Sequence, residues 1–362
     1  FADTINVNPG ESIQAAINAS SNGDVINIAA GTYYEYNLNP SGKAITIQGT
    51  LNGDGSLATT IDAQQGGGVF VISSGEGSGT VIQDLMITGG LAYRGGGILC
   101  DNNSNPTISD CTIESNTASS HGGGIYCYYN SSPTISGCTI SNNTTSGYDS
   151  NGGGIFCGWN SFPSIINCTI EGNKSYNWGG GIFCWDSFPT ITDCDFINNS
   201  ADLGGGIYCI ISNPTITDCT ISGNTAVFGG GGGIYCYNGS SPTISGCTIS
   251  GNNSPAGDEV GGGISSVDAN YISNPTISDS EICGNEPDQI NGNYTDAGGN
   301  TVADECPWED CAADLNNSGV VDIEDLLLLI GGWGTSDGDC NADGDTDIKD
   351  LLVLIGGWGD CP

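Results

Sequence analysis

A repeated glycine-rich element constrains the fold of this chain more than any other feature of its sequence. Between residues 95 and 264, three or more consecutive glycines precede an isoleucine seven times, and successive isoleucines stand 25 to 30 residues apart. These isoleucines are Ile98, Ile125, Ile155, Ile182, Ile207, Ile234 and Ile264. A fixed period of this size indicates stacked layers, because one such unit cannot bury its apolar face alone. The sequence therefore predicts a solenoid.

Each layer reads approximately Gly-Gly-Gly-Ile-x-Cys, then a turn, then Pro-Thr-Ile-x-x-Cys-Thr-Ile-x-x-Asn. Successive side chains of a β-strand point to opposite faces. Ile125 and Cys127 should therefore share the inner face, while Tyr126 and Tyr128 share the outer face. We expect the isoleucine and cysteine columns to form the core.

The outer face of these strands carries aromatic side chains in nearly every layer. We predict that they form an exposed apolar strip that binds a partner: Tyr126, Tyr128, Phe156, Phe183, Trp185, Tyr208, Tyr235 and Tyr237. Eight such side chains in neighbouring layers would form a contiguous apolar surface larger than a monomer normally exposes. Self-association or docking of another extracellular protein is the first interpretation, and stacking on a glycan is the second. The alternative without a binding role is that aromatic residues simply have a high β-strand propensity, or that a loop covers them.

A column of asparagines follows the second cysteine of each layer at a fixed offset. It consists of Asn116, Asn143, Asn173, Asn199, Asn224, Asn252 and Asn285. One amide per layer at one turn position allows each side chain to donate to the oxygen of the next. We predict a structural asparagine ladder.

Twelve of the 17 cysteines belong to the repeat, in two columns. The first column is Cys100, Cys127, Cys157, Cys184, Cys209 and Cys236; the second is Cys111, Cys138, Cys168, Cys194, Cys219 and Cys247. We interpret both as small buried core residues, with disulfides between layers or soft-metal binding as alternatives. Disulfides are expected instead among the cysteines outside the repeat, Cys283, Cys306, Cys311, Cys340 and Cys361.

The beginning of the chain supports a family resemblance. Ser12-Ile-Gln-Ala-Ala-Ile17 predicts a short helix that covers one open end of the stack. Together with Gly23-Asp24, Gly31-Thr-Tyr33 and the repeats, it resembles the pectate-lyase-like right-handed parallel β-helix superfamily. The repeats are also similar to those of the polymorphic outer-membrane proteins, although only Phe196-Ile-Asn-Asn199 matches their Phe-x-x-Asn element. The resemblance implies an all-β fold and assigns no activity.

Two copies of a loop followed by an apolar segment end the chain. Oxygen-bearing residues recur at loop positions 1, 3, 5, 9 and 12, with a backbone carbonyl expected at position 7, which is the pattern that suits Ca²⁺. The predicted ligands of two Ca²⁺ sites are Asp314, Asn316, Ser318, Val320, Asp322 and Asp325, and Asp339, Asn341, Asp343, Asp345, Asp347 and Asp350. The alternative is a pair of Asx-rich turns that cap helices.

Aspartate at position 12 and the duplicated loop and helix resemble the type I dockerin module. Ser318 departs from the acidic residue usual at position 5, so we expect a weaker first site. Ile323-Glu324 and Ile348-Lys349 replace the Ser-Thr pairs that often recognise cohesin, so attachment to a surface other than a standard cohesin is expected. The full prediction is an N-terminal helical cap (1–22), a parallel β-helix (23–288), a C-terminal cap and short linker (289–310), and a small α-helical calcium-binding domain (311–362).

Charge and composition restrict the partners and the compartment. The formal net charge is −37, and the basic residues are Lys43, Arg94, Lys174 and Lys349. Nucleic acid and anionic bilayers both require a basic surface, so we expect neither as a partner. The sequence has no apolar run long enough to span a membrane, and it starts without methionine. We expect a processed, extracellular or cell-surface protein.

We predict no catalytic residue from the sequence. A uronate lyase needs an Arg or Lys base beside calcium-bound carboxylates, and a glycosidase needs clustered carboxylic acids. His121 precedes a glycine triplet at a position that holds arginine, asparagine, tryptophan or leucine in other layers, which is typical of a variable turn. The first interpretation is a non-catalytic structural or adhesive protein of an extracellular filament, matrix or surface layer. A polysaccharide lyase or hydrolase attached through its tail and a glycan-binding adhesin are the alternatives.

Overall fold

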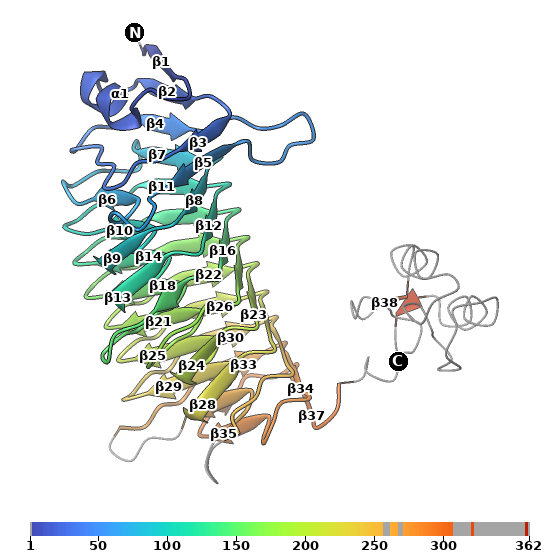
Figure 1. Ribbon diagram of the computed structural model, residues 1–362. Helices are drawn as coiled ribbons and strands as arrows, with labels where there is room; N and C mark the ends of the chain where they lie inside the picture. Colours follow the sequence, from blue (N-terminus) through green and yellow to red (C-terminus); the bar gives the residue numbers. More distant parts are fainter. Residues whose placement is uncertain (1, 256–260, 267–270, 307–319, 322–358, 361–362) are drawn as a thin grey trace. The chain divides into compact units, whose positions relative to one another are not determined.

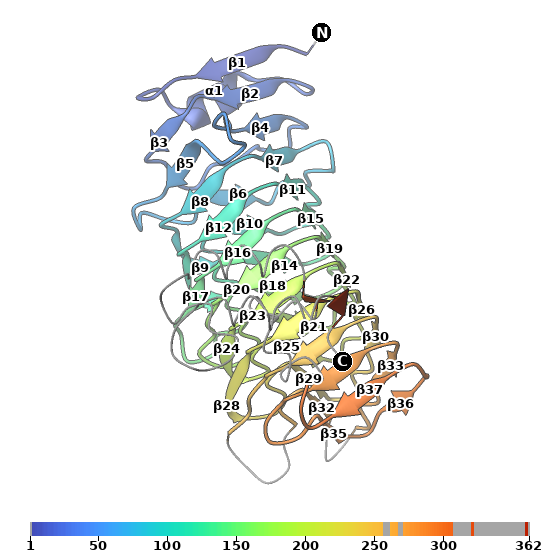
Figure 2. The ribbon, with the colours of Figure 1, turned by 90° about the vertical axis from the view of Figure 1, so that its right-hand side faces the viewer.

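The computed structural model describes residues 2–255, 261–266 and 271–306, together with the backbone of 320–321 and 359–360. The chain divides into two units, Phe1–Val302 and Ala303–Pro362. The first unit is a coil of parallel strands whose successive turns stack along one axis, and three long sheets run along it (Figures 1 and 2).

From β6 (Phe70–Ile72) onward, each turn of the coil contributes one strand to each sheet in the order C, A, B. Over the described residues, sheet A has twelve strands, sheet B eleven and sheet C nine. Sheet A consists of β1 (Thr4–Val7), β2 (Val25–Ile28), β4 (Thr46–Gln48), β7 (Val81–Gln83), β11 (Thr107–Ser109), β15 (Thr134–Ser136), β19 (Ser164–Ile166), β22 (Thr190–Thr192), β26 (Thr215–Thr217), β30 (Thr243–Ser245), β33 (Thr276–Ser278) and β36 (Thr295–Asp296). Sheet B consists of β3 (Gly31–Tyr33), β5 (Thr59–Asp62), β8 (Met86–Thr88), β12 (Thr112–Glu114), β16 (Thr139–Ser141), β20 (Thr169–Glu171), β23 (Asp195–Ile197), β27 (Thr220–Ser222), β31 (Thr248–Ser250), β34 (Glu281–Cys283) and β37 (Thr301–Ala303).

Sheet C contains the strands that follow the glycine triplets. They are β6 (Phe70–Ile72), β10 (Ile98–Cys100), β14 (Ile125–Tyr128), β18 (Ile155–Gly158), β21 (Ile182–Trp185), β25 (Ile207–Ile210), β29 (Ile234–Tyr237), β32 (Ile264–Ser266) and β35 (Ile290–Gly292). Short strands between sheets B and C form two small sheets: β9 (Leu91–Arg94), β13 (Thr117–His121) and β17 (Thr144–Thr145), and β24 (Ser200–Leu203) with β28 (Thr225–Gly229).

Neighbouring coils pair in register, so the same repeat position always meets itself. Ile125 lies opposite Ile98 and Ile155, and Cys127 lies opposite Cys100 and Cys157. The inner columns are fully buried, with Ile125 and Cys127 both 0% exposed. Full burial of one isoleucine side chain contributes about 1.5–3 kcal/mol, so repetition along the coil produces a continuous core. The predicted inward face is confirmed.

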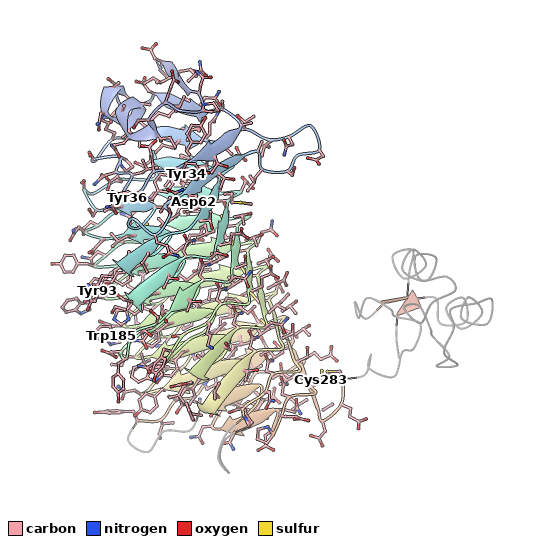
Figure 3. The ribbon with its side chains drawn as sticks, in the orientation of Figure 1. Tyr34, Tyr36, Asp62, Tyr93, Trp185 and Cys283 are labelled. Atoms are coloured by element: carbon pink, nitrogen blue, oxygen red, sulfur yellow. The ribbon has the colours of Figure 1, made fainter. Side chains whose placement is uncertain are left out.

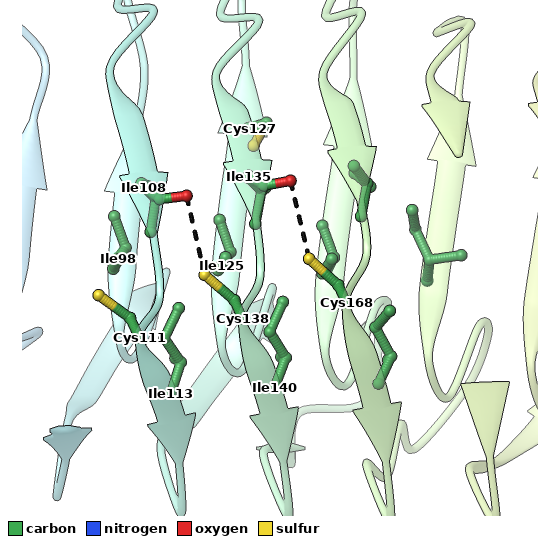
Figure 4. Close-up of a cluster of buried hydrophobic side chains, with 14 of the residues drawn as sticks. Ile98, Ile108, Cys111, Ile113, Ile125, Cys127, Ile135, Cys138, Ile140 and Cys168 are labelled. Carbon is green, nitrogen blue, oxygen red and sulfur yellow. Dashed lines mark hydrogen bonds between the residues drawn. The ribbon is translucent and has the colours of Figure 1, made fainter. Parts of the chain in front are cut away.

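The twelve repeat cysteines are free thiols buried in this core. In the second column the thiols contact backbone of the preceding coil: Cys138 Sγ lies 3.7 Å from the Ile108 carbonyl oxygen and Cys168 Sγ 3.7 Å from that of Ile135 (Figure 4). Burial raises the pKa of the Cys236 thiol to about 12, so this thiol is protonated at neutral pH. Outside the repeat, Cys283 and Cys306 are each disulfide-bonded.

Single residues with positive φ make the corner between sheets A and B. This conformation is least strained for glycine and is tolerated by asparagine and aspartate. The corner residues are Asp84, Asp110, Gly137, Asn167, Asp193, Asp218, Gly246 and Asp279. Each of these corners is therefore occupied by a residue type that tolerates a positive φ.

The asparagine ladder lines the corner after sheet B. Asn116 Nδ2 donates to Asn143 Oδ1 at 3.1 Å, and the Asn116 backbone N–H donates to the same oxygen at 3.0 Å. The contact repeats from coil to coil up to Asn252 and Asn285, at 2.9 Å. A Cβ at Gly124 would lie 3.0 Å from Asn143 Nδ2 and 2.7 Å from the Gly154 carbonyl oxygen, so the ladder and the stacked backbone together require glycine here.

Helix α1 (Ile13–Ala19) covers the first coil, with Ser12 as its N-cap. Both helix ends are held by side chains from later in the chain. Glu35 carboxylate oxygens accept from the backbone N–H of Ile13 at 2.6 Å and of Gln14 at 3.2 Å. Strand β1 precedes the helix and extends sheet A, which the sequence analysis did not predict.

The other end of the coil differs from the prediction. Residues 289–303, expected to be a cap and linker, add β35, β36 and β37 to the three sheets. The stack therefore continues one coil further than the glycine repeat. In the second unit, β38 (Val320–Val321) pairs antiparallel with β39 (Gly359–Asp360). Across the described residues, no helix is long and apolar enough to cross a membrane.

Candidate functional site

The aromatic column on the outer face of sheet C is buried, which corrects the expectation of an exposed strip. Tyr126, Phe156, Phe183 and Tyr208 are each at most 3% exposed. Their rings stack from coil to coil with centroids 5.0–5.3 Å apart. We call these four residues the central row.

Two flanking rows cover the central row. The entry row, just before the glycine triplets, is Arg94, His121, Asn151, Trp178 and Leu203, which meet one another across β13 and isolated bridges. The exit row, at the ends of the sheet C strands, is Tyr128, Gly158, Trp185, Ile210 and Tyr237, which pair in register.

Ring stacking across the rows explains the burial. The His121 imidazole lies 4.7 Å from the Phe156 ring, and the Trp178 indole lies 5.5 Å from the Tyr208 ring. Tyr128, Ile210 and Tyr237 pack against the central row from the other side. Strand alternation correctly placed the central row outside the core, but it could not show that neighbouring rows would cover it.

The remaining predicted partner residues are more accessible. Tyr128, Tyr235 and Tyr237 are half-buried, and Trp185 is 38% exposed. Trp185 and Tyr93 project from the same side of the coil (Figure 3). The sequence analysis did not identify Trp159, which is 48% exposed and stacks on Trp185 with centroids 6.5 Å apart and planes 8° apart.

Backbone conformation explains why Trp159 escaped the sequence analysis. Tyr129 and Trp159 occupy the same position just after their strands, and both have positive φ, 53° and 49°. This conformation breaks the alternation on which the inner and outer assignments depend. One sequence signal could have identified Trp159: Tyr129 and Trp159 place an aromatic residue at the same offset in two successive repeats.

A cavity of about 300 Å³ opens beside Asn151, where the entry row has no ring. In a single coil, the entry row has Asn151 and the exit row has Gly158, while the central row keeps Phe156. The cavity is lined by His121, Asp149, Asn151, Phe156, Trp178, Phe183, Trp185 and Ile210. It therefore combines aromatic rings with an amide, an imidazole and a carboxylate.

The protonation state of His121 and its contact with Asn151 define the polar side of the cavity. Burial and the nearby Arg94 charge lower the pKa of His121 to about 4, against an opposing effect of Asp149, so the imidazole is neutral at neutral pH. Asn151 Nδ2 lies 3.4 Å from His121 Nδ1. With the amide as donor, Nδ1 accepts and Nε2 carries the hydrogen.

Asn151 Oδ1 is a buried acceptor without a hydrogen-bond partner. Asn151 is only 5% exposed, and buried polar groups normally find a partner. An orphan acceptor in the wall of a cavity indicates a place where a ligand can donate a hydrogen bond.

Arg94 and Lys43 make contacts outside the cavity lining. The Arg94 guanidinium carbon lies 5.2–5.8 Å from the ring centroids of Tyr93, Tyr126 and Tyr128, in cation–π range. Lys43 Nζ donates to three backbone carbonyls at the end of α1. Neither side chain lines the cavity, so Asp149 is the charged group there.

The family model described as right handed beta helix region matches residues 51–210 and 189–323. The chain belongs to this family. No curated protein matches the sequence significantly. The family assignment agrees with the observed stack of parallel coils.

Solved structures resemble this β-helix at low sequence identity. Pectate lyase Pel9A matches with a TM-score of 0.51 at 15% identity, over 84% of this chain and 80% of its own. ORF18 of Geobacillus virus E2 gives 0.45 at 13% identity, over 83% and 60%. The PL6 family alginate lyase AlyGC gives 0.40 at 12% identity, over 82% and 50%. Identities this low indicate a shared fold and assign no function.

The predicted calcium ligands of the C-terminal module lie outside the described residues, except for the backbone of Val320 in β38. In the part of the chain that the structure describes, no group of three or more His, Cys, Asp or Glu side chains could hold a metal ion. The two Ca²⁺ sites therefore stay a sequence prediction.

Proposed function

We propose that this β-helix binds a polysaccharide along the outer face of sheet C. The supporting observation is the ring-lined cavity at Asn151, which has the exposed indole of Trp185 in its wall. Ligand sites are typically concave, mostly apolar and supplied with a few convergent polar groups. The C–H faces of sugar rings pack on aromatic faces, and sugar hydroxyls pair with amide, imidazole and carboxylate groups.

The repeat suits a ligand that is itself a repeating chain. Coils are about 4.8 Å apart, so equivalent side chains of the entry and exit rows recur at short, regular intervals along the axis. Trp159 and Trp185 continue the aromatic surface beside the cavity. A polysaccharide can contact several coils at once and gain affinity from many weak contacts.

Cleavage of the bound polysaccharide is the second candidate function. The fold of this chain resembles that of pectate lyase Pel9A. The specific observation in this chain is that His121 and Asp149 line the same cavity. Because His121 Nδ1 accepts from Asn151, the Asp149 carboxylate is the candidate proton acceptor. An assay of new reducing ends or unsaturated products tests this candidate, and its failure leaves binding untouched.

Self-association in a filament or matrix takes third place. The exposed strip of rings was one of the two contacts on which that interpretation relied, and four of its eight residues are buried against their neighbours. A structural or adhesive role remains compatible with polysaccharide binding, because an adhesin can hold a surface glycan. Sedimentation of the purified protein distinguishes filaments from monomers.

We also propose that the tail binds two Ca²⁺ ions and attaches the protein to another extracellular component after export. The support is the duplicated sequence pattern, in which carboxylate and amide oxygens recur at the spacing of a calcium loop.

Affinity electrophoresis in gels that contain soluble polysaccharides tests the main proposal. The wild-type protein should be retarded by at least one polysaccharide, and the double variant Trp159→Ala/Trp185→Ala should bind about tenfold or more weakly, a loss of about 1.4 kcal/mol. Tyr34→Ala, which removes an exposed ring outside the three rows, is the matched control. Absence of retardation across neutral and acidic polysaccharides would refute the proposal.

A further inference from the structure

The three long sheets all finish in the last coil, which comprises residues 289–303. β35, β36 and β37 are the terminal strands of sheets C, A and B, and no other described strand pairs with their outer edges. They lie together at the end of the stack opposite α1 (Figure 2). Unpaired strand edges are a template for pairing with another chain, and natural sheets protect them by specific features.

The core column of sheet A changes its chemistry in the last coil. One register position holds isoleucine in every strand of this sheet from β1 to β33, beginning with Ile5 and ending with Ile277. In β36 this position holds Asp296, which pairs with Ile277. Paired residues of in-register parallel strands point to the same face, and Ile277 is 0% exposed. Asp296 therefore occupies a core position of the last coil.

The second cysteine column changes in the same way. The Cys247 backbone N–H donates to Ser280 Oγ at 3.1 Å, and the Ser280 backbone N–H donates to Asn300 Oδ1 at 3.0 Å. Asn300 Nδ2 donates to the Ile277 carbonyl oxygen at 2.8 Å. Cys247 Sγ makes the equivalent contact with the Ile216 carbonyl oxygen of its preceding coil, at 3.7 Å. Asn300 therefore continues the column that cysteine occupies in earlier coils.

The two polar replacements contact each other. Asn300 Nδ2 donates to Asp296 Oδ1 at 2.7 Å, and the Gly298 backbone N–H donates to the same oxygen at 2.9 Å. Asp296 is exposed, so its charge is in contact with water. We call Asp296 and Asn300 the polar end. It places a hydrated carboxylate where an added coil would require an apolar side chain.

The apolar part of this end is incompletely covered. Ile290 of β35 pairs with Ile264 at the core position of sheet C, and it is only partly buried. A second copy stacked on this end would cover Ile290, but it would also remove the Asp296 carboxylate from water. Burial of an unpaired charge is costly, and an inward-pointing charged residue is a recognised way to block pairing at a sheet edge.

The opposite end of the stack is closed differently. Helix α1 covers the first coil, and its Ile13 and Ile17 side chains are both 0% exposed. The helix thus shields the core at that end with apolar side chains. The last coil has no such helix among the described residues.

We propose that the polar end terminates the stack and prevents two copies of this chain from joining at their last coils. Without it, the last coil would present an apolar end with three free strand edges. Because α1 covers the other end, two last coils would meet each other by a two-fold axis and form a closed dimer. This inference goes beyond polysaccharide binding and does not depend on it.

The decisive variant is Asp296→Ile/Asn300→Val, which makes both core positions of the last coil apolar. Asp296→Ile alone is the second variant if the double variant does not fold. Thr295→Ile adds the same side chain at the neighbouring position of β36, on the outer face that it shares with Thr276, and is the matched control. Asp288→Asn removes one charge from an exposed residue just before β35 and controls for net charge.

Sedimentation equilibrium of the full chain measures association at a series of concentrations. Wild type, Thr295→Ile and Asp288→Asn should remain monomeric. The double variant should form dimers, with association about tenfold or more tighter than that of either control. Amide exchange locates the contact, because pairing of the free edge should slow exchange in β36 about tenfold or more as the dimer forms.

Three results would overturn the proposal. In the first, Asp296→Ile folds and stays monomeric at concentrations where the controls are monomeric. In the second, Thr295→Ile associates as tightly as the double variant, so that the core position has no special effect. In the third, wild type itself dimerises with slowed exchange in β36. None of these results bears on polysaccharide binding, which the gel assay tests separately.

Discussion

Asn143 Nδ2 donates a hydrogen bond of 3.1 Å to Asn173 Oδ1, one coil further along the stack. The same Nδ2 donates to the Ile113 carbonyl oxygen at 2.8 Å, while Asn143 Oδ1 accepts from Asn116. A single buried amide thus satisfies groups on both neighbouring coils. The ladder therefore contributes to stability through every coil that it joins.

Replacement of one rung should destabilise the stack strongly. Asn143→Ala leaves buried donors and acceptors on the neighbouring coils without partners, at about 1–3 kcal/mol for each. We expect the free energy of unfolding to fall by about 2–4 kcal/mol, measured by urea denaturation. Asn293→Ala, at an exposed asparagine, should change it by less than about 0.5 kcal/mol. Equal effects of the two substitutions would contradict a structural ladder.

The N-terminal helix depends on Lys43. Its Nζ donates to the carbonyl oxygens of Ile17, Asn18 and Ser20 at 2.6, 3.0 and 2.8 Å, which neutralises the free carbonyls at the end of α1. Lys43→Met should reduce stability by about 1–3 kcal/mol and should accelerate amide exchange in α1. Lys174→Met, at an exposed lysine, is the control. Unchanged exchange in α1 would show that Lys43 does not hold the cap.

The tail should bind Ca²⁺ independently of the β-helix. Titration of the full chain should give two ions per chain, with Asp314→Ala and Asp339→Ala each removing one. The first site should be weaker, because Ser318 supplies no charge at its loop position. Asp195→Asn, in β23 of the coil, should keep both ions. A wild-type chain that binds no Ca²⁺ would refute the calcium proposal without affecting polysaccharide binding.

Much of the coil could be predicted because each of its features depends on a local rule repeated in register. Strand alternation fixed the inward direction of Ile125 and Cys127. The offset of Asn143 and its equivalents indicated the ladder, because an amide at one corner of every coil must meet its neighbours. Both features occur in the structure.

The candidate site could not be predicted because it depends on contacts between rows. His121, Asn151 and Trp178 were interpreted as a variable turn position, although variation at a position that lines a cavity is expected when it shapes a site. The burial of Tyr126 arises from stacking on His121 and Phe156, which alternation along one strand does not describe. The exposed ring of Trp159 depends on a positive φ that sequence alternation does not reveal.

His121 should titrate with a pKa of about 4 in the folded protein, compared with its ordinary value of 6.5. It is the single histidine of the sequence, so one imidazole signal in an NMR titration reports this pKa directly. Asp149→Asn removes the group that opposes the shift and should lower the pKa further. A folded-state pKa near 6.5 would contradict a buried, neutral imidazole in the cavity wall.

The same shift predicts a pH dependence of stability. Between about pH 6.5 and pH 4 the unfolded chain binds a proton at His121 that the folded chain does not, so lowering the pH through this window favours unfolding. This contribution is fully present above pH 6.5 and is lost as the pH falls toward about 4; below that value both states are protonated and it changes no further. In His121→Gln the loss of stability in this window should be smaller than in wild type, as measured by urea denaturation at a series of pH values. Identical pH profiles for the two proteins would show that His121 is not desolvated in the folded state.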